Sequence, residues 1–260
     1  MAKKITTAER RHMAYLRQKG LVVGHAYETK LLKARREEVR RVLLLCQDVA
    51  DPERWPSVIE DQLTESGYIF DWYKGLYINA GLPRAQSITR DLSRSKAADP
   101  SGMWEQMIAQ YARERAGENI VSVEGSLKDE LVKLLRARLL ETDDVFGVEK
   151  LTQQVFKDYG KVATWMVRRI AQTETMIGMA EAGAMAADTL DVGFTKQWCC
   201  AHIRTRDSHL EMEKVPPIDK NEMFIVGPER AMMRWPHDTA SGAPAGEIIN
   251  CACDVIRRPK

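Results

Sequence analysis

The segment from Lys161 to Ala187, KVATWMVRRIAQTETMIGMAEAGAMAA, predicts the long helix around which the rest of the chain is organised. Its apolar residues, such as Val162, Ile170 and Ile177, recur at helical spacing and give the segment one apolar face. From Gly178 to Ala187 the side chains are mostly small. We therefore expect another backbone to pack closely against this second half of the helix.

Helical periodicity also dominates the chain on the N-terminal side of this segment. The predicted breaks are at Asp51-Pro52, at Gly81 to Pro83 and at Gly117, and a short strand is expected over residues 120–123. A short separate helix is expected between Gly147 and Gly160. These breaks suggest three parts: a basic helical arm over residues 1–50, a helical region over 51–118 and a C-terminal domain over 119–260.

The residue composition of the sequence changes after Leu190. Proline, glycine and other turn residues become frequent, and the apolar runs shorten. Short strands are expected within 194–198, 223–226 and 246–256. The fold class predicted from this pattern is α+β, with a mostly helical N-terminal region followed by a small α+β C-terminal domain with short strands.

The composition excludes several classes of protein. The chain has 260 residues, of which 44% are hydrophobic and 29% charged, as in ordinary globular proteins. No window of about 18 consecutive apolar residues suggests a membrane span, and the N-terminal charges precede no apolar run, so we expect neither a membrane partner nor a secretory signal. Five cysteines in such a chain favour reduced thiols or a metal site over disulfides.

Positive charge is concentrated at the N-terminus. Residues 1–41 carry 12 Lys or Arg and four Glu, a net charge of +8, while the remainder carries −6 and the whole chain +2. A polyanion such as DNA, or an acidic protein surface, is therefore one expected partner, and a solvated helix without a partner is the other interpretation. The predicted contact residues are Lys3, Lys4, Arg10, Arg11, Arg17, Lys19, Lys33, Arg35, Arg36, Arg40 and Arg41.

Thiols and imidazoles gather in the last third of the chain. They are Cys199, Cys200, His202, His209, His237, Cys251 and Cys253. Four such groups make the tetrahedral ligand set that zinc prefers. The predicted metal set is His209, Cys251 and Cys253, completed by Cys199 or alternatively by Cys200. Inert packing of buried thiols, with no cofactor, is the favoured interpretation, and bound zinc and a transient or structural pair of thiols are the two alternatives.

A second group combines Arg204, Arg206, Asp207 and His209 with Glu174. A guanidinium pairs readily with a carboxylate, so one of the two arginines is expected to reach Glu174 and to tie the long helix to the C-terminal segment. The alternative is catalytic, with His209 as acid or base and either Glu174 or Asp238 as the carboxylate that orients it. Trp198 and Trp235-Pro236 are expected to anchor a small core.

The order of these motifs resembles the head-morphogenesis family of tailed bacteriophages, the group typified by the F protein of phage Mu. The resemblance covers residues 168 to 256. The matching residues, which we expect to be mainly structural, are Thr173, Glu174, Trp198, Arg204, Thr205, Arg206, His209, Pro236, Asp238, Asn250, Cys251 and Cys253. This chain has His202 where the family commonly has Asp, and Asn250-Cys251-Ala252-Cys253 where the family has N-C-R-C.

This resemblance implies a non-enzymatic minor capsid protein that acts in virion assembly at the portal vertex. Its expected partners are the portal protein, the scaffold or the major capsid protein, together with double-stranded DNA bound without sequence preference. Its expected location is the virion or procapsid, and the host cytoplasm during assembly. Two alternatives are a virion-delivered enzyme, nuclease-like or nucleotide-transferring, that uses His209 with Arg204 and Arg206, and a zinc-stabilised nucleic-acid-binding protein unrelated to phages.

Overall fold

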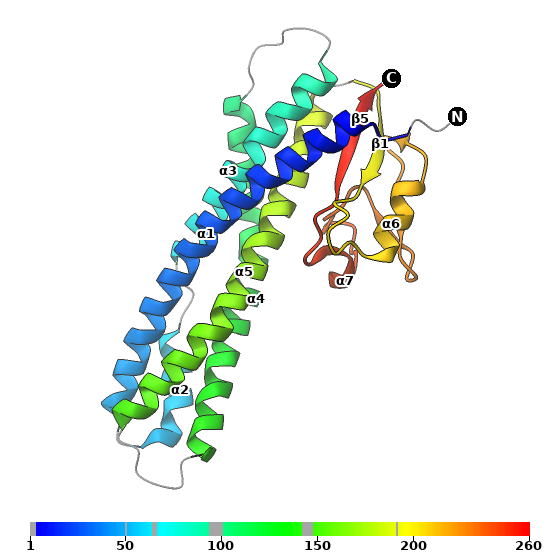
Figure 1. Cartoon of the computed structure of the whole chain (residues 1–260). Coiled ribbons are helices and arrows are strands. Elements are labelled where there is room, and N and C mark those ends of the chain that lie inside the picture. The colour runs from blue at the N-terminus through cyan, green and yellow to red at the C-terminus, as the bar shows by residue number, and fades with distance from the viewer. Residues whose placement is uncertain (1–3, 50, 64–66, 94–100, 142–147, 191) are drawn as a thin grey trace. The chain divides into compact units, whose positions relative to one another are not determined.

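The computed structural model describes residues 4–49, 51–63, 67–93, 101–141, 148–190 and 192–260 (Figure 1). It has the predicted α+β class, with long helices up to residue 189 and short strands and short helices after it. The helices are α1 (Thr7–Gln47), α2 (Trp55–Gln62), α3 (Gly67–Leu92), α4 (Ser101–Glu141), α5 (Val148–Thr189), α6 (Asp207–Lys214) and α7 (Ala245–Ile248), with a 3-10 turn at Pro52–Arg54. None of the described helices has both the length and the apolar content that crossing a membrane requires.

Two small antiparallel sheets follow the long helices. The first contains β1 (Phe194–Cys199) between β2 (Ile218–Asp219) and β5 (Asp254–Pro259), so that strands near the two ends of the C-terminal region are neighbours. In its register Trp198 lies opposite Val255, and Cys199 lies opposite Asp254. The second sheet is the hairpin of β3 (Phe224–Val226) and β4 (Ala231–Met233).

The chain forms two compact units, and neither is a continuous stretch of sequence. One contains residues 1–25, 73–112 and 171–260, and the other contains residues 26–72 and 113–170. The unit boundaries fall inside α1, α3, α4 and α5, rather than at the expected divisions after residues 50 and 118. The N-terminal 50 residues are therefore not a separate arm, because α1 contributes buried side chains to the cores of both units.

Several expected helix breaks are wrong. Helix α3 continues through Gly81 and Pro83, and α4 continues through Gly117 and the stretch that had been expected to form a strand. Helix α5 begins at Val148 and includes Gly160, so the separate short helix does not exist. Helix propensity is a weak preference that tertiary packing can override.

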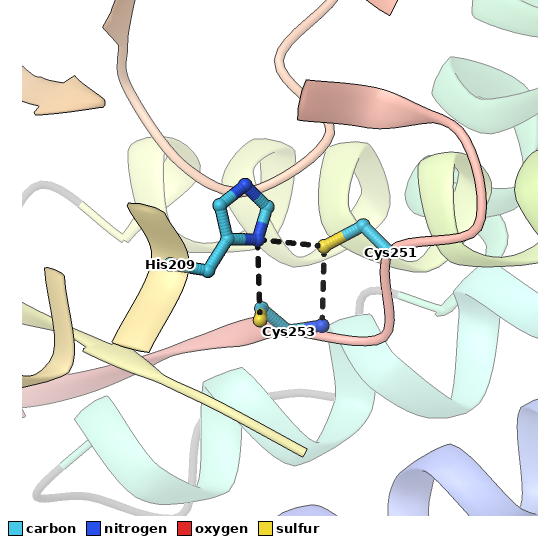
Figure 2. A group of neighbouring side chains, drawn as sticks. All are labelled: His209, Cys251 and Cys253. Atoms are coloured by element: carbon cyan, nitrogen blue, oxygen red, sulfur yellow. Dashed lines mark hydrogen bonds between the residues drawn. The ribbon is translucent and has the colours of Figure 1, made fainter. Parts of the chain in front are cut away.

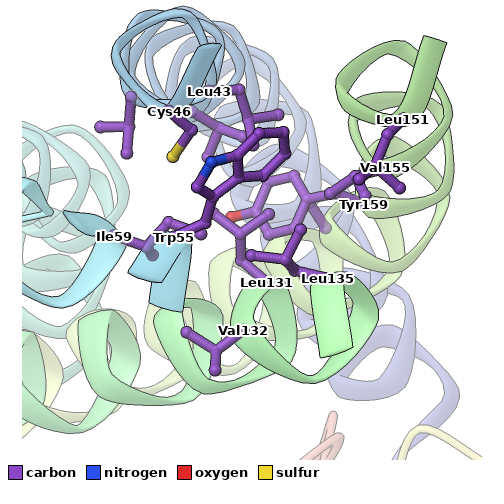
Figure 3. Close-up of a cluster of buried hydrophobic side chains, with 13 residues drawn as sticks. Leu43, Cys46, Trp55, Ile59, Leu131, Val132, Leu135, Leu151, Val155 and Tyr159 are labelled. Carbon is purple, nitrogen blue, oxygen red and sulfur yellow. The ribbon is translucent and has the colours of Figure 1, made fainter. Parts of the chain in front are cut away.

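The core of the second unit is built around two large aromatic side chains, Trp55 and Tyr159 (Figure 3). Both are almost completely buried, and Leu131, Leu135 and Val155 pack with them. The indole N–H of Trp55 donates to the backbone carbonyl of Val49 at 3.1 Å, so its one polar group is satisfied.

In the first unit, the small-residue half of α5 is approached closely, as predicted. A β-carbon added to Gly81 of α3 would lie 2.7 Å from the β-carbon of Ala182, closer than real side chains approach each other. A β-carbon added to Gly20 of α1 would lie 2.2 Å from the sulfur of Met179. Glycine on α3 therefore complements a small side chain of α5, and glycine on α1 leaves room for the Met179 side chain.

Candidate metal centre

The predicted His209, Cys251 and Cys253 come together in the C-terminal region (Figure 2). His209 projects from α6, and the two cysteines lie in the segment that leads into β5. Nδ1 of His209 is 3.4 Å from Sγ of Cys251 and 3.5 Å from Sγ of Cys253. All three side chains are buried.

These distances fit a tetrahedral metal. Zinc bonds of about 2.3 Å to sulfur and about 2.0 Å to nitrogen, at tetrahedral angles, separate a nitrogen and a sulfur ligand by about 3.5 Å. The ligand atoms of the three residues all lie within 4.8 Å of one another. Their soft thiol and imidazole donors are those that zinc prefers. The cluster could therefore hold a metal ion.

The thiols of the cluster are coupled through hydrogen bonds. Hydrogen bonds from Cys200 and Cys251 lower the pKa of Cys253, and His209 adds to this effect. The same interaction with Cys253, together with burial, raises the pKa of Cys251. Cys253 is thus the thiol that loses its proton first, and a thiolate is the form that binds a metal.

Glu247 of α7 completes the surroundings of His209. Its Oε2 lies 2.9 Å from Nε2 of His209 and accepts a hydrogen bond from the hydroxyl of Ser208 at 3.0 Å. A β-carbon at Gly227, where φ is +70°, would lie 2.5 Å from the other carboxylate oxygen. A carboxylate on the far nitrogen of a metal-binding histidine fixes the ring and strengthens its donor atom. No spacing in the sequence pointed to Glu247.

Cys199 does not belong to the cluster, which corrects the first of the two expected ligand sets. Successive residues of a strand point to opposite faces, so Cys199 and Cys200 diverge. Cys199 packs in the apolar cluster with Met13 and Leu16, and burial raises its pKa to about 11. Cys200 points toward α6, where its thiol donates to the carbonyl oxygen of His209 at 3.1 Å.

His237 is a further buried group beside the cluster. Its side chain is completely enclosed, and burial lowers its pKa to about 4, so the imidazole is neutral at pH 7. Its electrostatic neighbours are Cys253, Asp254 and His209. Among the described residues, neither of its ring nitrogens has a hydrogen-bond partner.

The motif residues on α5 make structural contacts. The hydroxyl of Thr173 accepts a hydrogen bond from the backbone N–H of Asn250 at 3.3 Å, which ties α5 to the cysteine segment. Glu174 accepts one from the hydroxyl of Tyr77 at 2.6 Å. Arg206 donates to the backbone carbonyl of Ile249, a different partner from the expected Glu174, while the Arg204 side chain is exposed.

The aromatic and turn residues of the motif are buried. The ring of Trp198 meets the His209 ring edge-on, with centroids 5.0 Å apart. Pro236 and Asp238 are enclosed, and Arg234 donates to both carboxylate oxygens of Asp238 at 2.7 and 2.9 Å. Burial opposes ionisation of Asp238, but these hydrogen bonds outweigh it and lower the pKa of the carboxyl.

The basic residues expected to contact DNA do not form one group. Lys3 lies outside the described residues. Arg10 forms a bidentate pair with Glu213, Arg17 donates to the carbonyl of Cys200 at 3.2 Å, and Arg35 is buried beside Glu38. These three arginines stabilise the fold. The exposed members are Lys4, Arg11, Lys19, Lys33, Arg36, Arg40 and Arg41.

No protein-family model matches the chain, and neither the curated proteins nor the solved structures include a detectable relative. The resemblance to the phage head-morphogenesis family therefore rests on the motifs in the sequence.

Proposed function

We propose that this chain is a minor head protein of a tailed bacteriophage, and that zinc held by His209, Cys251 and Cys253 stabilises its C-terminal region as a binding module. The observation that carries this proposal is the convergence of the family-like motifs on one buried His/Cys/Cys cluster. Zinc would supply a cross-link between α6 and the segment before β5, a structural role that closed zinc sites commonly have.

The contacts of the motif residues support a structural role. Thr173 binds the backbone at Asn250, Arg206 binds the backbone at Ile249, and Trp198 packs on His209. The first two contacts join segments that are 77 and 43 residues apart in the sequence. Residues that hold segments together in this way have a structural role. Such a role is expected in a folded module that binds other proteins of the assembling head.

The geometry favours this role over the enzyme alternative. The His209 ring is only 1% exposed, with one nitrogen facing thiols and the other facing Glu247. A general acid or base must come within hydrogen-bond reach of a substrate. Arg204 is exposed, and Arg206 is engaged with a backbone carbonyl. These three residues therefore lack the shared accessible surface that catalysis would need.

Double-stranded DNA is a further partner in this proposal. Lys33, Arg36 and Arg40 are exposed and recur every three to four residues along α1, so they share one side of the helix. Replacing all three with Ala should weaken DNA binding, and the slope of log Kobs against log salt should fall by roughly 3, at about 0.9 per phosphate contact. Fluorescence anisotropy with duplexes of unrelated sequence measures this slope.

A charge-matched control replaces three other exposed lysines, Lys157, Lys214 and Lys260, with Ala. If the slope falls equally in both triple variants, DNA binding depends only on the net charge of the chain. If neither triple variant changes the slope, α1 does not contact DNA.

Quantitative mass spectrometry of particles of the phage or prophage that encodes this chain tests the main proposal. We expect a few copies per particle, near the number of portal subunits or below, and loss of assembled heads when the gene is deleted. Absence of the chain from both procapsids and virions would contradict the proposed role.

A further inference from the structure

Arg257 of β5 is a buried cation without a counter-ion. The residue is 7% exposed, and its Nη1 is enclosed without a hydrogen-bond partner. Within the described part of the chain, its guanidinium group forms neither a hydrogen bond nor an ion pair. Removing a charge from water is costly, so buried arginines are normally paired with an anion. The structure around Arg257 therefore lacks a negative group that pairs with it.

The neighbours of Arg257 include two further cations. Lys196 lies directly opposite it in the ladder of β1 and β5 and is also buried, so two like charges share one face of the sheet. Arg84 of α3 lies on its other side, and burial together with this second guanidinium lowers the pKa of Arg257 to about 10. The carboxylates that attract Arg257 without forming an ion pair with it are Asp254, Asp188 and Glu181.

A cavity of about 490 Å³ lies next to the two arginines, and both of them line it. It belongs to the first unit, where it is bounded by the start of α1, the last turns of α3 and the edge strand β5. A β-carbon added to Gly183 would lie 3.4 Å from Nη1 of Arg257 and 3.3 Å from Cγ of Arg84, so the two side chains meet at one point of α5. Nε of Arg84 is also enclosed without a partner among the described residues. The cavity thus adjoins two buried arginines with unused N–H donors.

Two acidic residues also line the cavity, but both have basic neighbours of their own. Nε of Arg258 donates to Glu9 at 2.6 Å, and this bond lowers the pKa of Glu9 to about 2. Oδ2 of Asp91 lies 4.0 Å from Nε2 of His12. The side chains of Glu9 and Asp91 are 26% and 44% exposed, against 2% for Arg84. The acidic groups therefore lie on the solvent side of the cavity, and the buried arginines keep their need for an anion.

The lining also indicates which anion fits. A guanidinium presents a planar fork of donors that matches a carboxylate. Apolar surface comes from Met13, Ile88 and Ile256. The volume is in the usual range of small-molecule sites, which combine apolar walls with a few polar groups. We propose that the cavity binds a small organic carboxylate, whose charged group pairs with Arg257 and Arg84 and whose hydrocarbon part contacts the apolar wall. This site is separate from the assembly role and does not depend on zinc.

Hexanoate is a suitable probe of the full-length protein, and hexanamide is its uncharged counterpart. We expect hexanoate to raise the melting temperature and to shift the Nε–Hε NMR signals of Arg84 and Arg257. These signals are assigned by the loss of each one in the corresponding Met variant. We expect hexanamide at the same concentration to do neither.

Arg257→Met separates binding from folding. It replaces an unpaired buried charge with an apolar side chain, so the unliganded variant should melt no lower than the wild type, while its response to hexanoate is lost. Arg257→Lys, which keeps the charge but not the fork, is the second variant and should bind hexanoate about 10-fold more weakly. The control is Arg10→Met, because Arg10 is paired with Glu213 outside the cavity. It should melt lower and respond to hexanoate as the wild type does.

Three results would overturn the proposal. The first is a hexanoate response that is unchanged in both Arg257 variants. The second is an equal response to hexanoate and hexanamide, which would identify an apolar cavity without an anion site. The third is a shift of the two arginine signals by inorganic phosphate but not by hexanoate, which would identify an inorganic oxyanion as the ligand. No response to either anion would equally contradict a binding site here.

Discussion

Replacing Cys253 with Ser should abolish zinc binding and unfold the strands of the C-terminal region. The Cys253 sulfur is 3.5 Å from Nδ1 of His209, and its pKa is lowered by its hydrogen bonds, so its loss removes the thiol that most readily forms the thiolate a metal binds. Binding of structural zinc to zinc-finger peptides contributes about 10–16 kcal/mol at pH 7. That free energy is comparable to the entire stability of a typical domain, about 5–15 kcal/mol.

The matched control is Cys199→Ser. Cys199 is equally buried, but it packs against Met13 and Leu16 on the opposite face of β1. We expect this variant to keep its zinc and to lose only the stability associated with a buried thiol. Zinc content, thermal unfolding and hydrogen exchange in residues 194–259 measure both variants. Similar melting temperatures for wild type and Cys253→Ser would contradict a structural metal.

Asp254→Asn should lower the free energy of unfolding by about 3–5 kcal/mol, because it leaves buried arginines without their nearest carboxylate. Oδ1 of Asp254 lies 3.1 Å from Nη2 of Arg84, and both side chains are almost fully enclosed. Arg257 is buried beside them. Burial and the neighbouring Arg84 lower its pKa to about 10, so the two guanidinium groups repel each other.

Arg84→Met in the Asp254→Asn background should recover part of this loss, since it removes one of the repelling charges and fills the space with an apolar side chain. Urea unfolding of both single variants and the double variant gives the coupling free energy. Zinc content must be measured alongside, because Asp254 follows Cys253. A double variant less stable than Asp254→Asn would show that the ion pair is not the source of the effect.

The sequence was sufficient for the fold class because helical periodicity and turn composition are local properties. The helix through Lys161–Ala187 and the strands near Phe194 and Phe224 were located correctly. The breaks expected at Pro83 and Gly117 were wrong for a physical reason. Glycine in α3 lies against the small side chains of α5, and this packing depends on residues about 100 positions away.

The site was partly predictable. Residue chemistry and the clustering of thiols and imidazoles in the last third of the chain were enough to include His209, Cys251 and Cys253 in the expected set. The choice between Cys199 and Cys200 required the orientation of β1, which spacing alone does not give. Glu247 carried no signal in the sequence, since its role depends on the contact between α7 and α6.

The basic N-terminus shows why charge counting was a weaker guide. Some of the basic side chains form internal ion pairs instead of facing a partner, as the bidentate pair between Arg10 and Glu213 and the buried pair between Arg35 and Glu38 demonstrate. Only the exposed basic residues on α1 are free to contact DNA, and the salt dependence of DNA binding tests whether they do.

Native mass spectrometry of the full-length chain, purified without chelators, gives the zinc-to-protein ratio and so shows whether His209, Cys251 and Cys253 hold zinc. We expect one zinc per chain, released by acid together with loss of the C-terminal fold. A folded protein that carries no zinc, and that takes up none when zinc is added, would contradict it.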